Sequence, residues 1–171
     1  MKFGKISKSE LHDMWGQYIQ DLRVYVDDFD WYWYNPKFTK RGIYQGAKLV
    51  GFVITQSHEV SEFYISPEHR RKRFGLQAVQ MLSEELGEYR YYVLDRNKSG
   101  QAFWETATPN RYLMATDGRG KWYGNPKTDR GSGDRKHYAR TEKGKTEETP
   151  ADSGRTLFQQ IRLFPDVFVT A

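Results

Sequence analysis

The sequence predicts a mixed α/β domain in which one central sheet is flanked by helices. Two stretches, 7–29 and 76–86, repeat apolar residues at the helical period, and strand-like runs lie between and after them. Helical and strand-like stretches therefore alternate along the chain, which favours helices packed on a single sheet. The chain has 171 residues, enough for one ordinary domain with a core of its own.

A helix is predicted near the start of the chain. Ser7 and Glu10 have the spacing of a capping box, and apolar residues then follow the helical period as far as Phe29. Pro36 closes the dense aromatic run 29–34 that comes next. This run is open to three interpretations: an apolar pocket that favours an amine substrate, packing in the core or at an interface, and a protein-binding patch.

The middle of the chain alternates strands and helices. Runs at 42–47 and 48–56 are separated by turn residues that predict a hairpin, and 60–66 predicts a further strand that Pro67 ends. A basic loop at 68–75 then leads into the second helix, which Gly87 stops. The elements expected after it are a strand at 91–94, a short helix at 101–106 and a strand at 111–116.

Composition divides the chain into three parts. Residues 1–115 hold most of the periodic pattern and form the predicted core. Residues 116–155 contain 7 of the 15 glycines and ten basic residues against seven acidic ones, which predicts a Gly-rich basic insertion or an arm. Residues 156–171 turn apolar again, so we expect them to dock on the core as a strand or a helix.

Composition also excludes several kinds of site. The chain has no cysteine, which excludes disulfides and a thiol nucleophile, and its four histidines lack ligand spacing, so we expect no metal site. The net charge of +5 indicates an anionic partner but is too small and too diluted to favour nucleic acid. The sequence shows neither a membrane-spanning run nor an apolar signal region, so we expect a cytoplasmic protein with no membrane partner.

The basic loop is the first candidate binding site. Four consecutive cations, Arg70, Arg71, Lys72 and Arg73, precede a predicted helix. The first N–H groups of a helix lack intrahelical acceptors and carry a partial positive charge, so basic side chains at that end favour a phosphate or pyrophosphate. The alternative is a solvated basic loop with no ligand.

Residues 60–105 resemble the GNAT superfamily of N-acetyltransferases. The family loop (Arg/Gln)-x-x-Gly-x-(Gly/Ala), which wraps the pyrophosphate of acetyl-CoA, corresponds to 70–75, Arg-Arg-Lys-Arg-Phe-Gly. The family run Asn-x-x-Ala-x-x-Phe-Tyr-Glu corresponds to 97–105, Asn-Lys-Ser-Gly-Gln-Ala-Phe-Trp-Glu. The resemblance is best over 40–115 and absent over 116–155. It implies a GNAT-like mixed sheet, mostly antiparallel, flanked by helices.

The resemblance implies an acetyl-CoA-dependent N-acyltransferase that moves an acetyl group to an amine by direct attack. The acceptor amine belongs to a small molecule, a peptide or a protein. Glu62 is implied as the base, with Glu59 as the alternative, and a strand amide at Ile65 or Ser66 is implied beside the thioester. The residues implied to contact the cofactor are Ile65, Ser66, Arg70, Arg71, Lys72, Arg73, Phe74, Gly75, Leu76, Asn97 and Trp104.

Two positions depart from the family pattern. Arg73 stands where the family loop has its first glycine, and Trp104 stands where the family has a tyrosine that reprotonates the CoA thiolate. An indole N–H cannot act as a general acid at neutral pH, so Tyr91 or Tyr92 is the candidate replacement. The departures also leave a second hypothesis open, a non-catalytic GNAT-fold protein such as a phage virion component, with 116–155 as its assembly arm.

Overall fold

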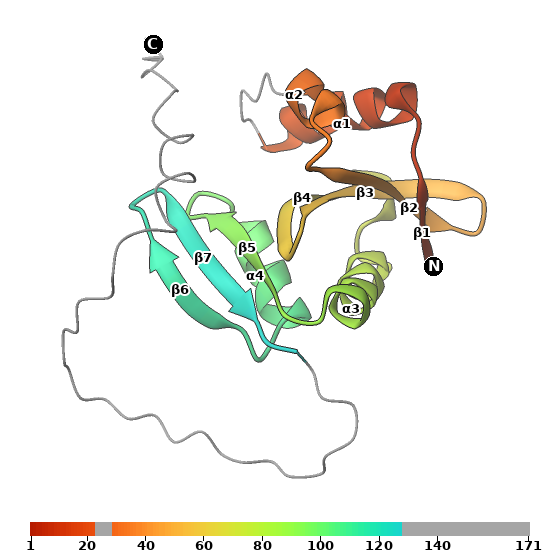
Figure 1. Ribbon diagram of the computed structural model, residues 1–171. Coiled ribbons are helices and arrows are strands. Elements are labelled where there is room, and N and C mark those ends of the chain that lie inside the picture. Colours follow the sequence, from red (N-terminus) through yellow and green to blue (C-terminus); the bar gives the residue numbers. More distant parts are fainter. Residues whose placement is uncertain (23–28, 128–171) are drawn as a thin grey trace, which may run out of the picture. The chain divides into compact units, whose positions relative to one another are not determined.

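A seven-stranded sheet organises the part of the chain that the structure describes, residues 1–22 and 29–127 of a computed structural model (Figure 1). The strand order is β1-β2-β3-β4-β5-β7-β6. The strands are β1 (Lys2–Lys5), β2 (Thr39–Gln45), β3 (Lys48–Gln56), β4 (Glu59–Ile65), β5 (Tyr89–Leu94), β6 (Tyr112–Thr116) and β7 (Gly120–Asn125). All neighbouring strands are antiparallel except β4 and β5, which are parallel.

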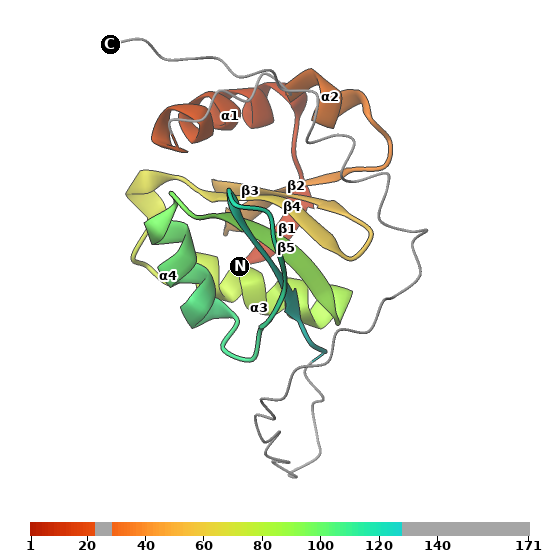
Figure 2. The same ribbon diagram turned by 90° about the vertical axis from the view of Figure 1, so that its left-hand side faces the viewer.

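Helices cover both faces of the sheet (Figure 2). The helices are α1 (Lys8–Leu22), α2 (Phe29–Tyr34), α3 (Phe74–Leu86) and α4 (Lys98–Ala107), and a short 3-10 helix, η1 (Pro67–His69), follows β4. Helices α1 and α2 lie on one face, and α3 and α4 lie on the other. The predicted α/β class with a mostly antiparallel sheet is therefore confirmed. None of the described helices is long and apolar enough to cross a membrane.

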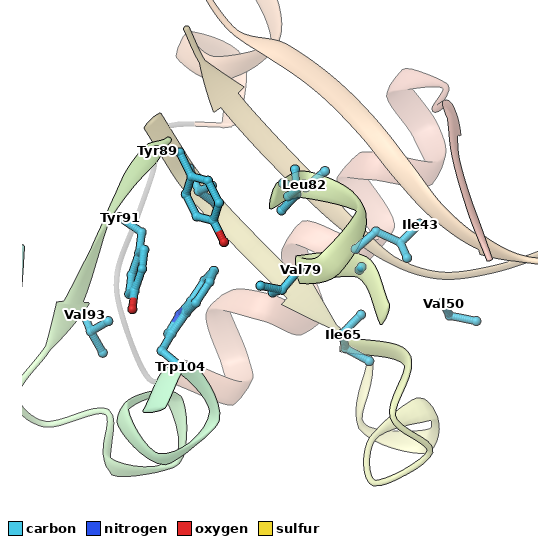
Figure 3. Packing of buried hydrophobic residues seen from close by; sticks show 12 residues of the cluster. Ile43, Val50, Ile65, Val79, Leu82, Tyr89, Tyr91, Val93 and Trp104 are labelled. Atoms are coloured by element: carbon cyan, nitrogen blue, oxygen red, sulfur yellow. The ribbon is translucent and has the colours of Figure 1, made fainter. Parts of the chain in front are cut away.

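Two hydrophobic clusters lie on opposite faces of the sheet. Phe52 and Val53, adjacent in β3, are both fully buried because successive strand residues point to opposite faces. The cluster on the α3 and α4 face (Figure 3) contains Ile43, Val50, Val53, Val60, Ile65, Ala78, Val79, Leu82, Tyr89, Tyr91, Val93 and Trp104. The cluster on the α1 and α2 face contains Ile6, Leu11, Met14, Trp15, Tyr18, Phe29, Phe38, Phe52, Ile54 and Tyr64. Strands β5, β6 and β7 contribute nothing to the second cluster, so α1 and α2 cover the β3 and β4 side of the sheet.

The start of α1 has the predicted capping box. The Ser7 N–H donates to Glu10 Oε2 at 2.9 Å, and the Glu10 N–H donates to Ser7 Oγ at 3.2 Å. The described part of α1 runs to Leu22, and Phe29 begins helix α2. Residues 23–28, which the periodic pattern also assigned to this helix, lie outside the described residues.

The sheet continues beyond residue 115, where we expected the core to end. Strand β7 falls inside the segment 116–155 and pairs with β5 on one side and β6 on the other. Glycines hide this strand in the sequence: a Cβ added at Gly120 would lie 2.6 Å from the Tyr92 ring, and one at Gly124 would lie 2.3 Å from the Tyr112 ring. The glycines thus make room for aromatic rings on one face of the sheet. The remainder of 116–155 and all of 156–171 lie outside the described residues.

Candidate active site

The parallel strands β4 and β5 pair only where they begin. Their register comprises two residue pairs, Glu59 with Arg90 and Val60 with Tyr91, although both strands continue further (Figure 1). Strand β4 contains a bulge, because Ser61 has no partner in the β3 register. A bulge bends its strand and increases the local twist. The bulge therefore accounts for the divergence of β4 from β5 immediately after the paired residues.

The Ile65 backbone amide of β4 points toward the side from which β5 diverges. The Ser66 N–H donates to Val50 O at 3.1 Å, and Gly51 opposes Ile65 in the register of β3 with β4. Alternate residues of an antiparallel strand direct their N–H groups to opposite sides, so the Ile65 N–H points away from β3. The Ile65 amide is therefore placed for a ligand between the diverging strands. The Ser66 amide is used within the sheet, and the Ser66 side chain is fully buried.

The loop that precedes α3 has an unusual backbone. Arg71 and Arg73 have φ values of 59° and 63°, in the left-handed region, and Lys72 between them does not. Turn conformations of this kind direct successive N–H groups into one concavity that suits an anion. Arg73 is also the N-cap residue of α3, and no side chain caps the helix. Its first N–H groups therefore stay open at the positive end of the helix dipole.

The four predicted cations of this loop separate into two groups. Arg71, Lys72 and Arg73 are exposed, and within 1–22 and 29–127 none of them forms an ion pair. Arg70 instead pairs with Asp21 of α1. Three positive charges are thus free to meet an anion at the N-terminus of α3, while the fourth is held by the protein itself.

The three residues that open α3 are half-buried. Phe74 packs edge-on against the His69 ring, with 6.3 Å between the ring centres, and Leu76 is the third residue of the helix. A Cβ added at Gly75 would lie 2.8 Å from the Phe103 ring of α4. Gly75 therefore allows the close approach of α3 and α4, which is a packing role in addition to any contact with a ligand.

Asn97 and Trp104 both have structural roles in α4. The Asn97 side chain is the N-cap of the helix, since its Oδ1 accepts the Gly100 N–H at 2.9 Å. The Trp104 ring is buried and stacks on the Tyr91 ring, with the ring centres 4.1 Å apart (Figure 3). Trp104 thus belongs to the hydrophobic cluster between α4 and β5.

Neither tyrosine considered as a replacement general acid has an uncommitted hydroxyl. Thr108 Oγ1 donates to Trp104 O at 2.7 Å, so the Tyr91 hydroxyl donates to Thr108 Oγ1 at 2.6 Å. Burial raises the pKa of Tyr91 to about 12. The Tyr92 hydroxyl donates to the Asp117 carboxylate at 2.8 Å. Burial is the main cause that raises the pKa of Tyr92 well above its ordinary value, and this hydrogen bond is the second cause.

Glu62 lies on the face covered by α1 and α2, beside the diverging part of β4. Its half-buried carboxylate accepts the Tyr18 hydroxyl of α1 and, at 2.9 Å, the Tyr32 hydroxyl of α2. Burial and the charge of Glu62 raise the pKa of Tyr18 well above its ordinary value, so this phenol stays protonated and keeps donating. The alternative base, Glu59, pairs with Arg90 at 3.0 Å where β4 and β5 are still joined. The structure therefore places Glu62, and not Glu59, near the divergence.

Sequence reasoning did not find the two phenols that hold this carboxylate. Tyr18 fits the apolar period of α1 and is buried, so its pattern is that of a core residue. Tyr32 belongs to the aromatic run 29–34, and the amine-pocket interpretation of that run was the one signal that pointed to this place. The structure also contains a cavity of about 810 Å³, but of the predicted site residues only Glu59 lines it. Within the described residues no group of three or more His, Asp or Glu is arranged to hold a metal ion.

Comparison with solved structures identifies the fold. No protein-family model matches the sequence, and no curated protein is similar to it in sequence. An acetyltransferase from Thermus thermophilus is similar with a TM-score of 0.60, 15% identity, and coverage of 73% of this chain and 96% of that one. The PaiA N-acetyltransferase from Thermoplasma acidophilum in complex with coenzyme A is similar with a TM-score of 0.53 and 18% identity, and the match covers 74% of this chain and 98% of that one. The ribosomal-protein-S18-alanine N-acetyltransferase from Escherichia coli has a TM-score of 0.52 and 15% identity, and the match covers 77% of this chain and 97% of that one. The chain therefore has the GNAT fold.

The buried phenol of Tyr91 makes stability depend on alkaline pH. An unfolded tyrosine titrates near pH 10, and burial raises the pKa of folded Tyr91 to about 12. Between these values the unfolded chain binds fewer protons, so the free energy of unfolding falls as pH rises, by up to about 1.4 kcal/mol per pH unit for one group. We expect Tyr91→Phe to lose stability less steeply than the wild type in urea unfolding. Thr108→Val, which keeps the phenol, should retain the steep fall, and equal slopes for Tyr91→Phe and wild type would contradict the assignment.

The left-handed backbone of Arg73 predicts an unequal response to glycine. Arg73→Gly should give a free energy of unfolding about 1 kcal/mol higher than Lys72→Gly, because only the first change relieves a left-handed conformation. The entropy that glycine adds to the unfolded chain is common to both variants and cancels in the comparison. Chemical denaturation measures the difference. Two equally destabilised variants would show that the conformation of Arg73 costs nothing.

Proposed function

We propose that the protein is a CoA-dependent N-acyltransferase that moves an acetyl group from acetyl-CoA to an amine. The observation that carries the proposal is the divergence of β4 from β5 beside the uncapped N-terminus of α3. The divergence leaves strand amides for an extended ligand, and the helix end with its exposed cations suits a diphosphate. These two features match the two ends of CoA. When bound, acetyl-CoA supplies the acetyl thioester and the leaving thiolate.

The loop and the start of α3 bind the anionic end in this proposal. Arg71, Lys72 and Arg73 contribute charge without first breaking an ion pair, since none of them has one within the part of the chain described. The N–H groups of 74–76 add hydrogen bonds, which are stronger to a charged acceptor than to a neutral one. On β4, the Ile65 N–H would be the hydrogen-bond donor to the carbonyl oxygen of the thioester.

Glu62 accepts the proton of the attacking amine in this proposal, directly or through a water molecule. A primary amine is mostly protonated at neutral pH and must lose a proton to attack a carbonyl carbon. The carboxylate oxygens of Glu62 each accept one phenol. The hydroxyls of Tyr18 and Tyr32 thereby fix the orientation of the base.

The leaving thiolate does not depend on a phenolic acid in this proposal. A cysteine thiol has an ordinary pKa of about 8.5, far below that of an alcohol, so the thiolate of a thiol of this kind would be an adequate leaving group that solvent can protonate. Tyr91 and Tyr92 both donate to internal acceptors, and Trp104 is packed in the core. The absence of cysteine is consistent with direct attack, without an acyl group on an enzyme thiol.

The acceptor is proposed only as an amine on a small molecule or a protein. One similar structure is named for acetylating an alanine of ribosomal protein S18, which is an acceptor of this class. The packing of Trp104 in the core favours a second candidate, a non-catalytic protein with the same fold. Neither the fold nor the comparisons supports a virion role for such a protein, and its assembly segment 116–155 lies largely outside the described residues.

Calorimetric titration with CoA and with acetyl-CoA tests the binding half of the proposal. We expect saturable binding by the wild type. Arg73→Glu should bind CoA at least about tenfold more weakly, because a negative charge replaces a positive one at the helix N-terminus. Arg119→Glu is the matched control, since Arg119 is an exposed arginine in the turn before β7. No binding by the wild type, or equal losses in the two variants, would overturn the assignment of the loop.

Acetyl transfer by Glu62→Gln tests the chemical half. A panel of small amines and of peptides with free N-termini supplies the acceptor, and loss of the thioester is followed. We expect Glu62→Gln to lower kcat/KM by about 100-fold or more while CoA affinity stays near the wild-type value, because a general base typically contributes this much. Glu59→Gln should cost far less. The larger loss in Glu59→Gln would move the role of base to Glu59, and CoA binding without transfer to any amine would favour the non-catalytic candidate.

A further inference from the structure

Arg70 differs from the three cations that follow it because its guanidinium has partners within the described part of the protein. The Arg70 Nε–H donates to Ile65 O at 2.9 Å, and a terminal N–H of the same guanidinium pairs with the Asp21 carboxylate. The guanidinium carbon also lies 5.5 Å from the centre of the Tyr64 ring, a cation–π contact. One side chain thus connects the loop before α3, the end of β4 and the last turn of α1.

Helix α1 contacts the β4 region at two points on one helical face. Asp21 and Tyr18 are three residues apart and therefore lie on the same side of the helix. Tyr18 donates to Glu62, while Asp21 pairs with Arg70. The Tyr64 ring lies between these two contacts, since its centre is 5.4 Å from that of the Tyr18 ring. The contacts that hold Glu62 and Arg70 are therefore neighbours along a single helix.

The ion pair also answers an electrostatic problem at the end of α1. The last turn of α1 within the described residues contains Asp21 and no basic residue. A carboxylate at this end faces the negative pole of the helix dipole and destabilises the last turn unless a cation is close to it. Arg70 supplies that cation from outside the helix. Loss of the pair would therefore loosen the turn that follows Tyr18.

We propose that Arg70 is a positioning residue and not a ligand of the cofactor. Through Asp21 it fixes the last turns of α1, and α1 holds the Tyr18 hydroxyl on Glu62. The orientation of the base thereby depends on Arg70, the first residue of the loop before α3. The inference rests on the proposed function only for the catalytic role of Glu62. It assigns diphosphate binding to Arg71, Lys72, Arg73 and the backbone of α3.

In a ligand role, the two N–H groups that Arg70 uses inside the protein would have to leave the Ile65 carbonyl and the Asp21 carboxylate, and the guanidinium would move off the Tyr64 ring. Arg71 stands next to it, exposed and without an ion pair among the residues described. Arg70→Gln and Arg71→Gln are therefore a matched pair: the first removes the connection to α1, and the second removes a cation that faces solvent.

NMR of protein labelled with carbon-13 at the tyrosine Cζ atoms tests the inference without any substrate. The Tyr18 signal, identified by its loss in Tyr18→Phe, reports on the hydrogen bond to Glu62, and Glu62→Gln marks its position when the acceptor has no charge. We expect the Tyr18 signal of Asp21→Asn and of Arg70→Gln to move toward that position. Asp21→Glu keeps the charge and should restore the wild-type signal, and Arg71→Gln should leave it unchanged. A change confined to fraying of the helix end would not move a Tyr18 signal in this way.

Calorimetry with CoA on the same variants completes the test. We expect Asp21→Asn and Arg70→Gln to bind CoA within about twofold of the wild type, and Arg71→Gln to bind at least about fivefold more weakly. An unmoved Tyr18 signal in Asp21→Asn would overturn the inference, and so would a loss of CoA affinity in Arg70→Gln as large as that in Arg71→Gln. If the wild type binds no CoA, the proposed function fails, and the Tyr18 signal still decides whether Arg70 positions α1. Should Arg70→Gln fail to fold, Asp21→Asn and Asp21→Glu give the same decision.

Discussion

The divergence of β4 from β5 is the constraint on which the rest of the candidate site depends. One extra residue in β4, Ser61, bends the strand immediately after its two paired positions with β5. The bend directs an unpaired backbone edge of β4 away from β3 and brings the end of the strand to the loop before α3. A continuous parallel ladder would have satisfied those amides within the sheet and left no place for an extended ligand.

The end of the bent strand leads into a loop whose backbone is strained for the residues it contains. Two arginines adopt the left-handed conformation that glycine adopts without cost, one of them at the position where the GNAT loop has glycine. Strain of this kind persists where the surrounding structure enforces it and is common at ligand-binding loops. In this chain the loop combines a left-handed backbone with exposed positive charge, and both features favour an anion.

The face of the sheet that α1 and α2 cover carries the second half of the candidate site. Glu62 lies under α1 and α2 and is held by one phenol from each helix, so its orientation depends on where those helices dock. Arg70 connects α1 to the loop before α3 through its ion pair with Asp21. The two halves of the site are thus connected by side chains of α1 and by the few residues between the end of β4 and the start of α3.

The fold class could be predicted from the sequence because it rests on local signals. Helical periodicity and turn residues predicted a mixed α/β domain with one sheet, and the two motifs that resemble those of the GNAT superfamily predicted the GNAT fold that the structure has. The run of four cations before a helix predicted an anion-binding loop, which stays a prediction. The sequence did not predict strand β7, because its two glycines are explained only by tertiary neighbours: the Val93 carbonyl and the Tyr92 ring at Gly120, and the Tyr112 ring at Gly124. Similarly, Tyr18 has the pattern of a core residue, and only the packing of α1 on β4 makes it a partner of Glu62. The partner of Arg70 is an acidic residue 49 positions earlier in the chain, a separation at which no sequence pattern reports which side chains meet.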